Sequence, residues 1–72
     1  MTNSTIENTR KNIKKIRIDK GFTQAELSEM AGITCDYLSE IERDKKVPSL
    51  ETIHCLAQAL NVEPYRLLMR SE

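Results

Sequence analysis

Residues 23–42, TQAELSEMAGITCDYLSEIE, restrict what this chain can fold into more than any other stretch. Thr23 and Glu26 stand at the spacing of a capping box, which starts an α-helix. Gly32 is expected to end that helix, because glycine takes the left-handed backbone conformation at little steric cost. Thr34 then offers an N-cap for a second helix. The stretch therefore predicts two short helices joined by a tight turn.

Apolar residues recur in both predicted helices at the spacing of a single helix face. They are Leu27, Met30 and Ala31 in the first helix and Leu38 and Ile41 in the second. Ile33, in the turn, is expected to be buried as well. Two capped helices joined by so short a turn form a helix-turn-helix unit.

The N-terminal part of the chain predicts one further helix. Residues 1–8 are polar and are expected to fray. A helix is expected over residues 8–20, with Ile13 and Ile16 on its inner face. Gly21 should end this helix for the same reason as the glycine above.

Two helices are predicted after the helix-turn-helix unit. Pro48 prevents a preceding helix from continuing. Ser49 is the N-cap of the next helix, because its side-chain oxygen can accept from a free backbone N–H of the first turn. Its apolar stripe is the most regular in the chain and consists of Ile53, Leu56, Ala57 and Leu60. Pro64 suits the first turn of the last helix, over residues 64–70. The prediction is an all-α fold in a single domain, residues 1–72.

The composition excludes several classes of protein. Of the 72 residues 39% are hydrophobic, which suits a folded domain, and no apolar run is long enough to span a bilayer. The N-terminus lacks an apolar signal core, so we expect a cytoplasmic protein with reduced cysteines. So small a bundle leaves little room for a catalytic pocket, and neither an enzyme nor a cofactor is expected. Cys35, Cys55 and His54 do not stand at metal-ligand spacing.

Four segments, taken in order, resemble the lambda-repressor-like (Xre-type, Cro/repressor) helix-turn-helix family. They are FTQAEL (22–27), AGIT (31–34), YLSEIER (37–43) and PSLET (48–52). The resemblance covers roughly residues 10–69. It implies a compact five-helix bundle that binds double-stranded DNA as a transcriptional regulator of the phage-repressor or restriction–modification-controller kind. Such a protein reads an inverted-repeat operator through the major groove as a homodimer.

The resemblance also implies which residues touch DNA. The second helix of the unit lies in the major groove, and the first aims its N-terminus at a phosphate. The implied contacts are Thr23, Gln24, Thr34, Cys35, Asp36, Tyr37, Ser39, Glu40, Arg43, Lys45 and Lys46. For Tyr37, a half-buried packing residue is the equal alternative.

Charge leaves a second function open. The formal net charge is zero, whereas nucleic-acid-binding proteins are commonly basic. Asp36 and Glu40 stand where family members often carry Arg, Gln, Asn or Ser. A carboxylate accepts a hydrogen bond from the cytosine amino group, but it also repels phosphates. The alternative is an antitoxin or protein-interaction module that retains the fold, binds DNA weakly or not at all, and acts on a protein partner.

Two structural roles are implied as well. In the family an Arg of the first helix pairs with the Glu that ends the reading helix, and Arg17 and Glu42 match those positions. Asp44 stands where the family usually has Gly, and Asp tolerates a left-handed backbone better than most residues. The implied dimer interface is Val62, Tyr65, Leu68 and Met69, whereas Leu67 is expected to pack in the core.

Overall fold

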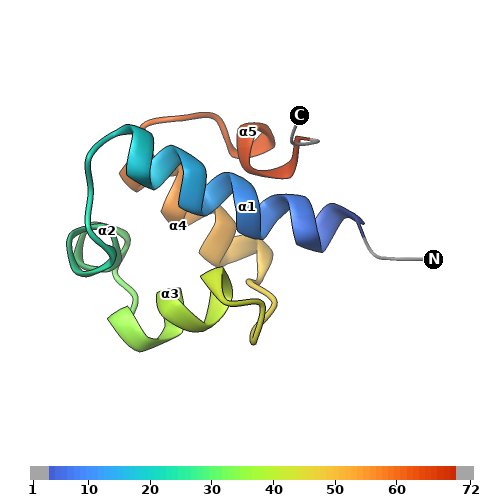
Figure 1. Cartoon of the computed structure of the whole chain (residues 1–72). Helices are drawn as coiled ribbons and strands as arrows, with labels where there is room; N and C mark the ends of the chain where they lie inside the picture. The colour runs from blue at the N-terminus through green and yellow to red at the C-terminus, as the bar shows by residue number, and fades with distance from the viewer. Residues whose placement is uncertain (1–3, 70–72) are drawn as a thin grey trace.

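A computed structural model describes the backbone of residues 4–69 and the side chains of residues 9–69. This part of the chain contains five α-helices: α1 (Ser4–Asp19), α2 (Gln24–Ala31), α3 (Cys35–Glu42), α4 (Leu50–Leu60) and α5 (Pro64–Leu68). Figure 1 shows α1 crossing the molecule, with α5 on one side of it and α3 on the other. The predicted all-α, five-helix architecture is confirmed.

Local hydrogen bonds set the ends of α2 and α4 where the sequence predicted them. Thr23 Oγ1 accepts from the Glu26 N–H at 3.0 Å, and Glu26 Oε1 accepts from the Thr23 N–H at 2.8 Å. Ser49 Oγ caps α4 by accepting from the Thr52 N–H at 3.1 Å. Each of these bonds spans only three residues, so the sequence alone determines them.

The outer ends of the bundle differ from the prediction. α1 begins at Ser4, four residues before the predicted start, and residues 1–3 of the segment expected to fray lie outside the described residues. Polar composition weakens burial, but it does not prevent helical backbone angles. α5 ends at Leu68 because Met69 is extended, with φ −69° and ψ 150°. Residue 70, the last of the predicted helix, lies outside the described residues.

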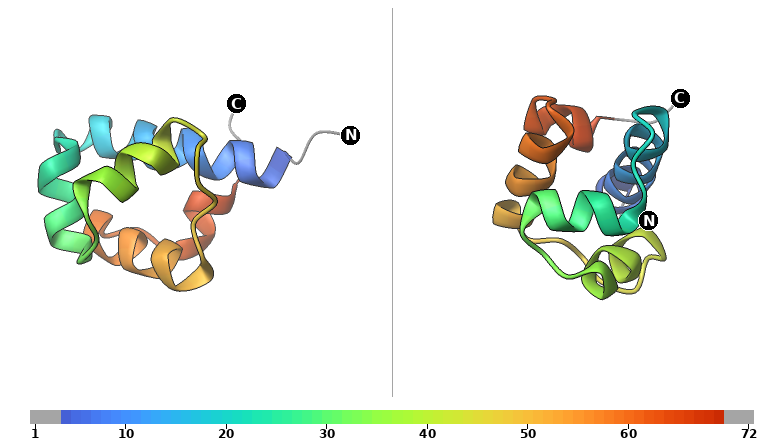
Figure 2. Two further views of the ribbon diagram at one scale, coloured as in Figure 1. Left: turned by 90° about the horizontal axis from the view of Figure 1, so that it is seen from below. Right: turned by 90° about the vertical axis from the view of Figure 1, so that its left-hand side faces the viewer.

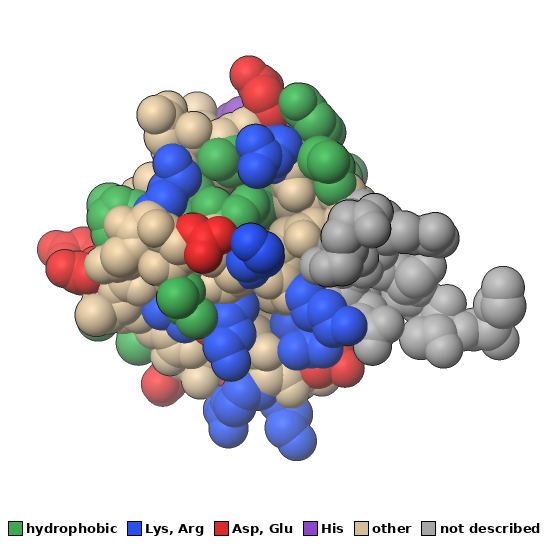
Figure 3. All heavy atoms as spheres, turned by 45° about the horizontal axis from the view of Figure 1, so that its top comes forward, with side chains coloured by type: hydrophobic (Ala, Val, Ile, Leu, Met, Phe, Trp, Pro, Cys, Tyr) green, Lys and Arg blue, Asp and Glu red, His purple; other side chains and the backbone are tan. Residues whose placement is uncertain are grey.

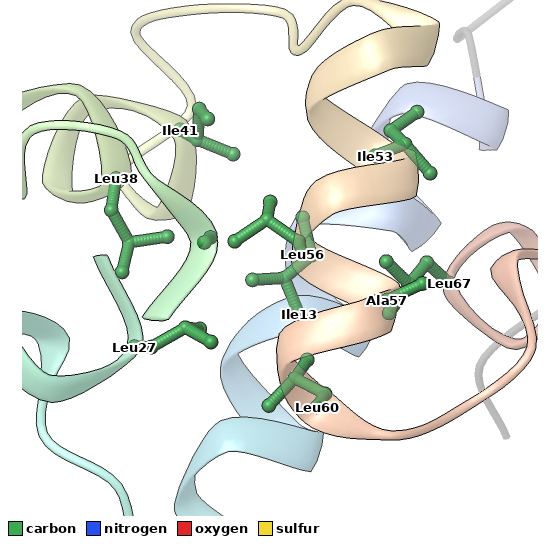
Figure 4. Close-up of a cluster of buried hydrophobic side chains, with 10 residues drawn as sticks. Ile13, Leu27, Leu38, Ile41, Ile53, Leu56, Ala57, Leu60 and Leu67 are labelled. Atoms are coloured by element: carbon green, nitrogen blue, oxygen red, sulfur yellow. The ribbon is translucent and has the colours of Figure 1, made fainter. Parts of the chain in front are cut away.

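The core lies between the helices and takes a residue or more from each (Figure 4). Its fully buried members are Ile13, Leu27, Leu38, Leu56, Ala57, Leu60 and Leu67, with Ala31, Ile41 and Ile53 almost as well covered. Two predictions were wrong in part. Leu27, Ser28 and Ala31 fill the inner face of α2, so Met30 remains 47% exposed. Ile33 packs against the core but is only half-buried.

α1 packs between helices that are far apart in the sequence. It packs against α5 and α3, while α2 packs against α3 and α4. Two further views show α3 at the surface of the bundle beside α2 (Figure 2). None of the helices in the described part of the chain is both long and apolar enough to cross a lipid bilayer.

Two leucines of α4 test the core directly. Leu56 is fully buried and Leu50 is 79% exposed. We expect Leu56→Ala to lower the free energy of unfolding by about 2–5 kcal/mol, through lost burial and the cavity left behind. Leu50→Ala is the matched control and should cost less than about 0.5 kcal/mol. Urea denaturation measures both, and similar losses in the two variants would contradict this description of the core.

Candidate nucleic-acid interface

The turn between α2 and α3 determines how α3 is presented. Gly32 takes the left-handed conformation, with φ 76°, and closes α2. Thr34 Oγ1 accepts from the Tyr37 N–H at 3.0 Å and opens α3. The inner side of α3 carries Leu38, Ile41 and Glu42, all buried. Cys35 and Asp36, in the first turn, are exposed, so α3 has one side on the core and one in solvent.

The residues predicted to contact DNA lie at the start of α2, along α3 and in the loop that follows α3. Those with exposed side chains are Thr23, Thr34, Cys35, Asp36, Arg43, Lys45 and Lys46. Those that are half-buried are Gln24, Tyr37, Ser39 and Glu40. The three segments are brought together because α2 packs against α3.

The loop after α3 folds back on the end of that helix. Asp44 has φ 63°, the left-handed conformation predicted for this position. The Lys45 N–H donates to the Glu40 carbonyl at 2.7 Å, and the Lys46 N–H donates to the same carbonyl at 3.3 Å. Both lysines therefore lie at the C-terminal end of α3, with their side chains in solvent.

Tyr37 is a half-buried packing residue, which was the alternative to a DNA contact. Its ring packs against the core, and its hydroxyl oxygen lies 3.5 Å from Thr52 Oγ1 of α4. The side chain therefore holds α3 to α4. A partly exposed Tyr in this position is a weaker candidate for DNA contact than its exposed neighbours in the first turn of α3.

The predicted ion pair between Arg17 and Glu42 is confirmed. Arg17 Nε donates to Glu42 Oε2 at 2.8 Å, and Nη2 donates to Oε1 at 3.0 Å. Nη1 donates to the Phe22 carbonyl at 2.8 Å, so each guanidinium nitrogen has a protein acceptor. The two side chains are only 11% and 2% exposed. The pair joins α1 to α3 through two charge-assisted hydrogen bonds, which are stronger than bonds between neutral groups.

Sequence reasoning missed a third member of this group. Gln24 Nε2 donates to Glu42 Oε1 at 2.9 Å, which links the first residue of α2 to the last residue of α3. No local pattern predicts this bond, because the two residues stand 18 positions apart. Gln24 is thus held by the protein at the position where the sequence predicted a DNA contact.

Asn12 was missed as well, and it acts on the other side of α1. Its buried amide Nδ2 donates to the Leu67 carbonyl at 3.1 Å and to the Met69 carbonyl at 2.6 Å. These bonds cap the end of α5 and hold Met69 extended. A polar residue beside Ile13, on the inner face of α1, was the only available signal.

In the described part of the sequence, two groups of exposed basic side chains each stand close together. The first group is on α1, where Lys11, Lys14 and Lys15 are exposed. Figure 3 shows Lys and Arg side chains gathered on one face of the molecule. The second group is the loop after α3, with Arg43, Lys45 and Lys46. Within the described residues, no three His, Cys, Asp or Glu side chains gather in a way that could hold a metal ion.

Two isosteric substitutions test the buried ion pair. We expect Glu42→Gln to lower the free energy of unfolding by about 3 kcal/mol or more, because Arg17 would lose its carboxylate inside the protein. Asp19→Asn is the matched control. It breaks the Lys15–Asp19 pair, whose side chains are 67% and 61% exposed, and should cost less than about 1 kcal/mol. Chemical denaturation measures both, and an equally small loss from Glu42→Gln would refute the role given to the pair.

Comparisons with known proteins agree with this geometry. A helix-turn-helix family model matches residues 13–67. The immunity repressor protein of Bacillus phage phi105 is 43% identical over 51 residues, which cover 71% of this chain and 35% of that protein. The chain thus spans about a third of the repressor's length.

Two solved structures share the fold. The hypothetical transcription factor NHTF from Neisseria has a TM-score of 0.87 at 32% identity, over 92% of this chain and 76% of that one. SinR, a master regulator for biofilm formation solved in complex with DNA, has a TM-score of 0.80 at 35% identity, over 85% and 98%. All three relatives are named for regulation: an immunity repressor, a hypothetical transcription factor and a master regulator. The family match, the linked motifs and the shared fold together place this chain in the helix-turn-helix family of lambda-repressor-like proteins.

Proposed function

We propose that this chain is a sequence-specific DNA-binding transcriptional regulator, of the repressor kind, that reads an inverted-repeat operator as a homodimer. One observation carries the proposal. α3 is fixed to the bundle by its buried side and by Glu42, while Cys35 and Asp36 in its first turn face solvent. A helix held in this way can enter the major groove without losing its contacts to the protein. The likeness to SinR, which was solved with DNA, supports the same conclusion.

The flanking groups supply the phosphate contacts. The backbone N–H groups at the start of α2 and the helix dipole favour an anion there. Thr23 and Thr34 use their hydroxyl oxygens as cap acceptors, which leaves each hydroxyl hydrogen to donate to a phosphate. Arg43, Lys45 and Lys46 neutralise phosphates at the other end of α3. A regulator of this kind acts in the cytoplasm, where bacterial DNA lies.

Two acidic residues of α3, Asp36 and Glu40, give the protein its preference among operator sequences. Asp36 is exposed in the first turn, and Glu40 is half-buried one turn later. A carboxylate at a base edge accepts from the cytosine amino group, so we infer C·G pairs at these positions. The same carboxylates lower the affinity for phosphates, and the basic loop offsets this repulsion.

Two features support a dimer: the few base pairs that one domain can contact, and the apolar side chains exposed at α5. A single short domain contacts few base pairs, so two copies on half-sites about one helical turn apart are needed. Tyr65, Leu68 and Met69 are 61%, 39% and 47% exposed, which leaves an apolar face on and beside α5. Val62 contributes less than the sequence implied, because it packs partly against its own core.

The alternative function is a protein-interaction module or antitoxin. It is favoured by a net charge of zero and by the carboxylates of Asp36 and Glu40 on α3. The experiment that follows separates the two functions, because only an operator reader enriches a specific duplex.

We expect selection from a random duplex library at low salt to enrich an inverted repeat. For that duplex, Lys45→Gln should reduce the slope of log K against log salt by about 0.9, because one phosphate contact is lost. Lys11→Gln, an exposed lysine on α1, is the matched control and should leave the slope unchanged. If no sequence is enriched at any salt concentration, the regulator function is wrong and the protein-partner alternative stands.

Two methionines of equal exposure test the dimer. Met69 beside α5 and Met30 on α2 are each 47% exposed. We expect Met69→Glu to weaken self-association roughly tenfold or more, because two like charges would meet at the interface. Met30→Glu should leave it unchanged. Sedimentation equilibrium measures both, and a monomeric wild-type protein would rule out a dimer that forms without DNA.

A further inference from the structure

We propose that Glu42 is a positioning residue for DNA binding. It holds the carboxamide of Gln24 so that one N–H is bonded to the protein and the other is left to donate to an operator phosphate. The inference rests on the proposed function, and it adds to that function a buried residue that touches no DNA.

The geometry places Gln24 at the end of a rigid chain of contacts. Arg17 is fixed by its bond to the Phe22 carbonyl, and it donates to both carboxylate oxygens of Glu42. Glu42 is 4% exposed and cannot turn without breaking these bonds. Its Oε1 then accepts from Gln24 Nε2 at 2.9 Å. The carboxamide is therefore tied, through α3, to α1.

Chemistry decides which way the carboxamide faces. An ionised carboxylate only accepts hydrogen bonds, so it pairs with the NH₂ group of Gln24 and rejects the amide oxygen. The NH₂ group has two hydrogens, and the described residues supply only one acceptor for it. A phosphate oxygen is an acceptor of the same kind. The bond to Glu42 thus selects the rotamer and the amide orientation that suit a phosphate.

Holding the side chain in advance favours binding. A free Gln side chain loses rotamer freedom when it binds, and this loss opposes association. In this protein the freedom of Gln24 is already restricted on folding. The last residue of the reading helix consequently controls a phosphate contact made from the first residue of α2.

The first arm of the test uses the protein without DNA. Side-chain ¹⁵N relaxation compares the carboxamide of Gln24 with that of Gln58, an exposed residue of α4. We expect Gln24 to be clearly more ordered than Gln58 in the wild type and to approach it in Glu42→Gln. Equal mobility of the two carboxamides in the wild type would overturn the proposal, whatever the protein does with DNA.

The second arm is a double-mutant cycle on the enriched duplex. We expect Glu42→Gln to weaken binding about fivefold or more when Gln24 is present, and less than about twofold in the Gln24→Ala background. Equal losses in both backgrounds would mean that Glu42 acts only through the fold, and the proposal would fail while the proposed function stood. If the wild type binds no duplex, the proposed function fails and takes this inference with it.

A third variant covers the case in which Glu42→Gln does not fold. Gln24→Asn keeps the carboxamide and the buried Arg17–Glu42 pair, but the shorter side chain cannot reach both Glu42 and a phosphate. We expect it to bind the duplex as weakly as Gln24→Ala. Wild-type affinity in Gln24→Asn would overturn the proposal, because it would show that the bond to Glu42 is not needed.

Discussion

The position of the exposed side of α3 depends on the pairing of one carboxylate inside the bundle. Glu42 is buried at the end of α3, and a charge there is tolerated only if it is paired and hydrogen-bonded. Arg17 supplies two hydrogen bonds and Gln24 a third. The requirement to satisfy one charge therefore fixes the relative placement of α1, α2 and α3. The exposed side of α3 owes its position to what is buried behind it.

α1 connects this group to the opposite end of the molecule. On one side it presents Arg17 to α3, and on the other it presents Asn12 to the carbonyls at the end of α5. In the proposed dimer, α5 sets the distance between two copies and α3 reads the half-sites. Because both helices are bonded to α1, the separation of the two reading helices depends on one rigid element.

The zero net charge conceals an uneven distribution. Exposed lysines stand on α1 and in the loop after α3, while exposed Asp36 and half-buried Glu40 stand on α3 itself. The electrostatic potential at a bound phosphate is set by the charges within about 10 Å, because salt screens more distant ones. Total charge is therefore a poor guide to what this surface binds.

The sequence by itself determined the features that arise from bonds between near neighbours. The caps at Thr23, Thr34 and Ser49 follow from contacts within three positions, so the helix-turn-helix was predictable. The left-handed conformation of Asp44 was expected from the family resemblance, which places Asp44 where Gly is usual. The pairing of Arg17 with Glu42 was expected from the family resemblance.

Only the tertiary structure decided which side of each helix faces the core and which distant polar groups meet. It left Met30 exposed, buried Asn12 against the end of α5, and brought Gln24 to Glu42. These outcomes depend on the rotation and packing of whole helices, which spacing along one helix does not specify.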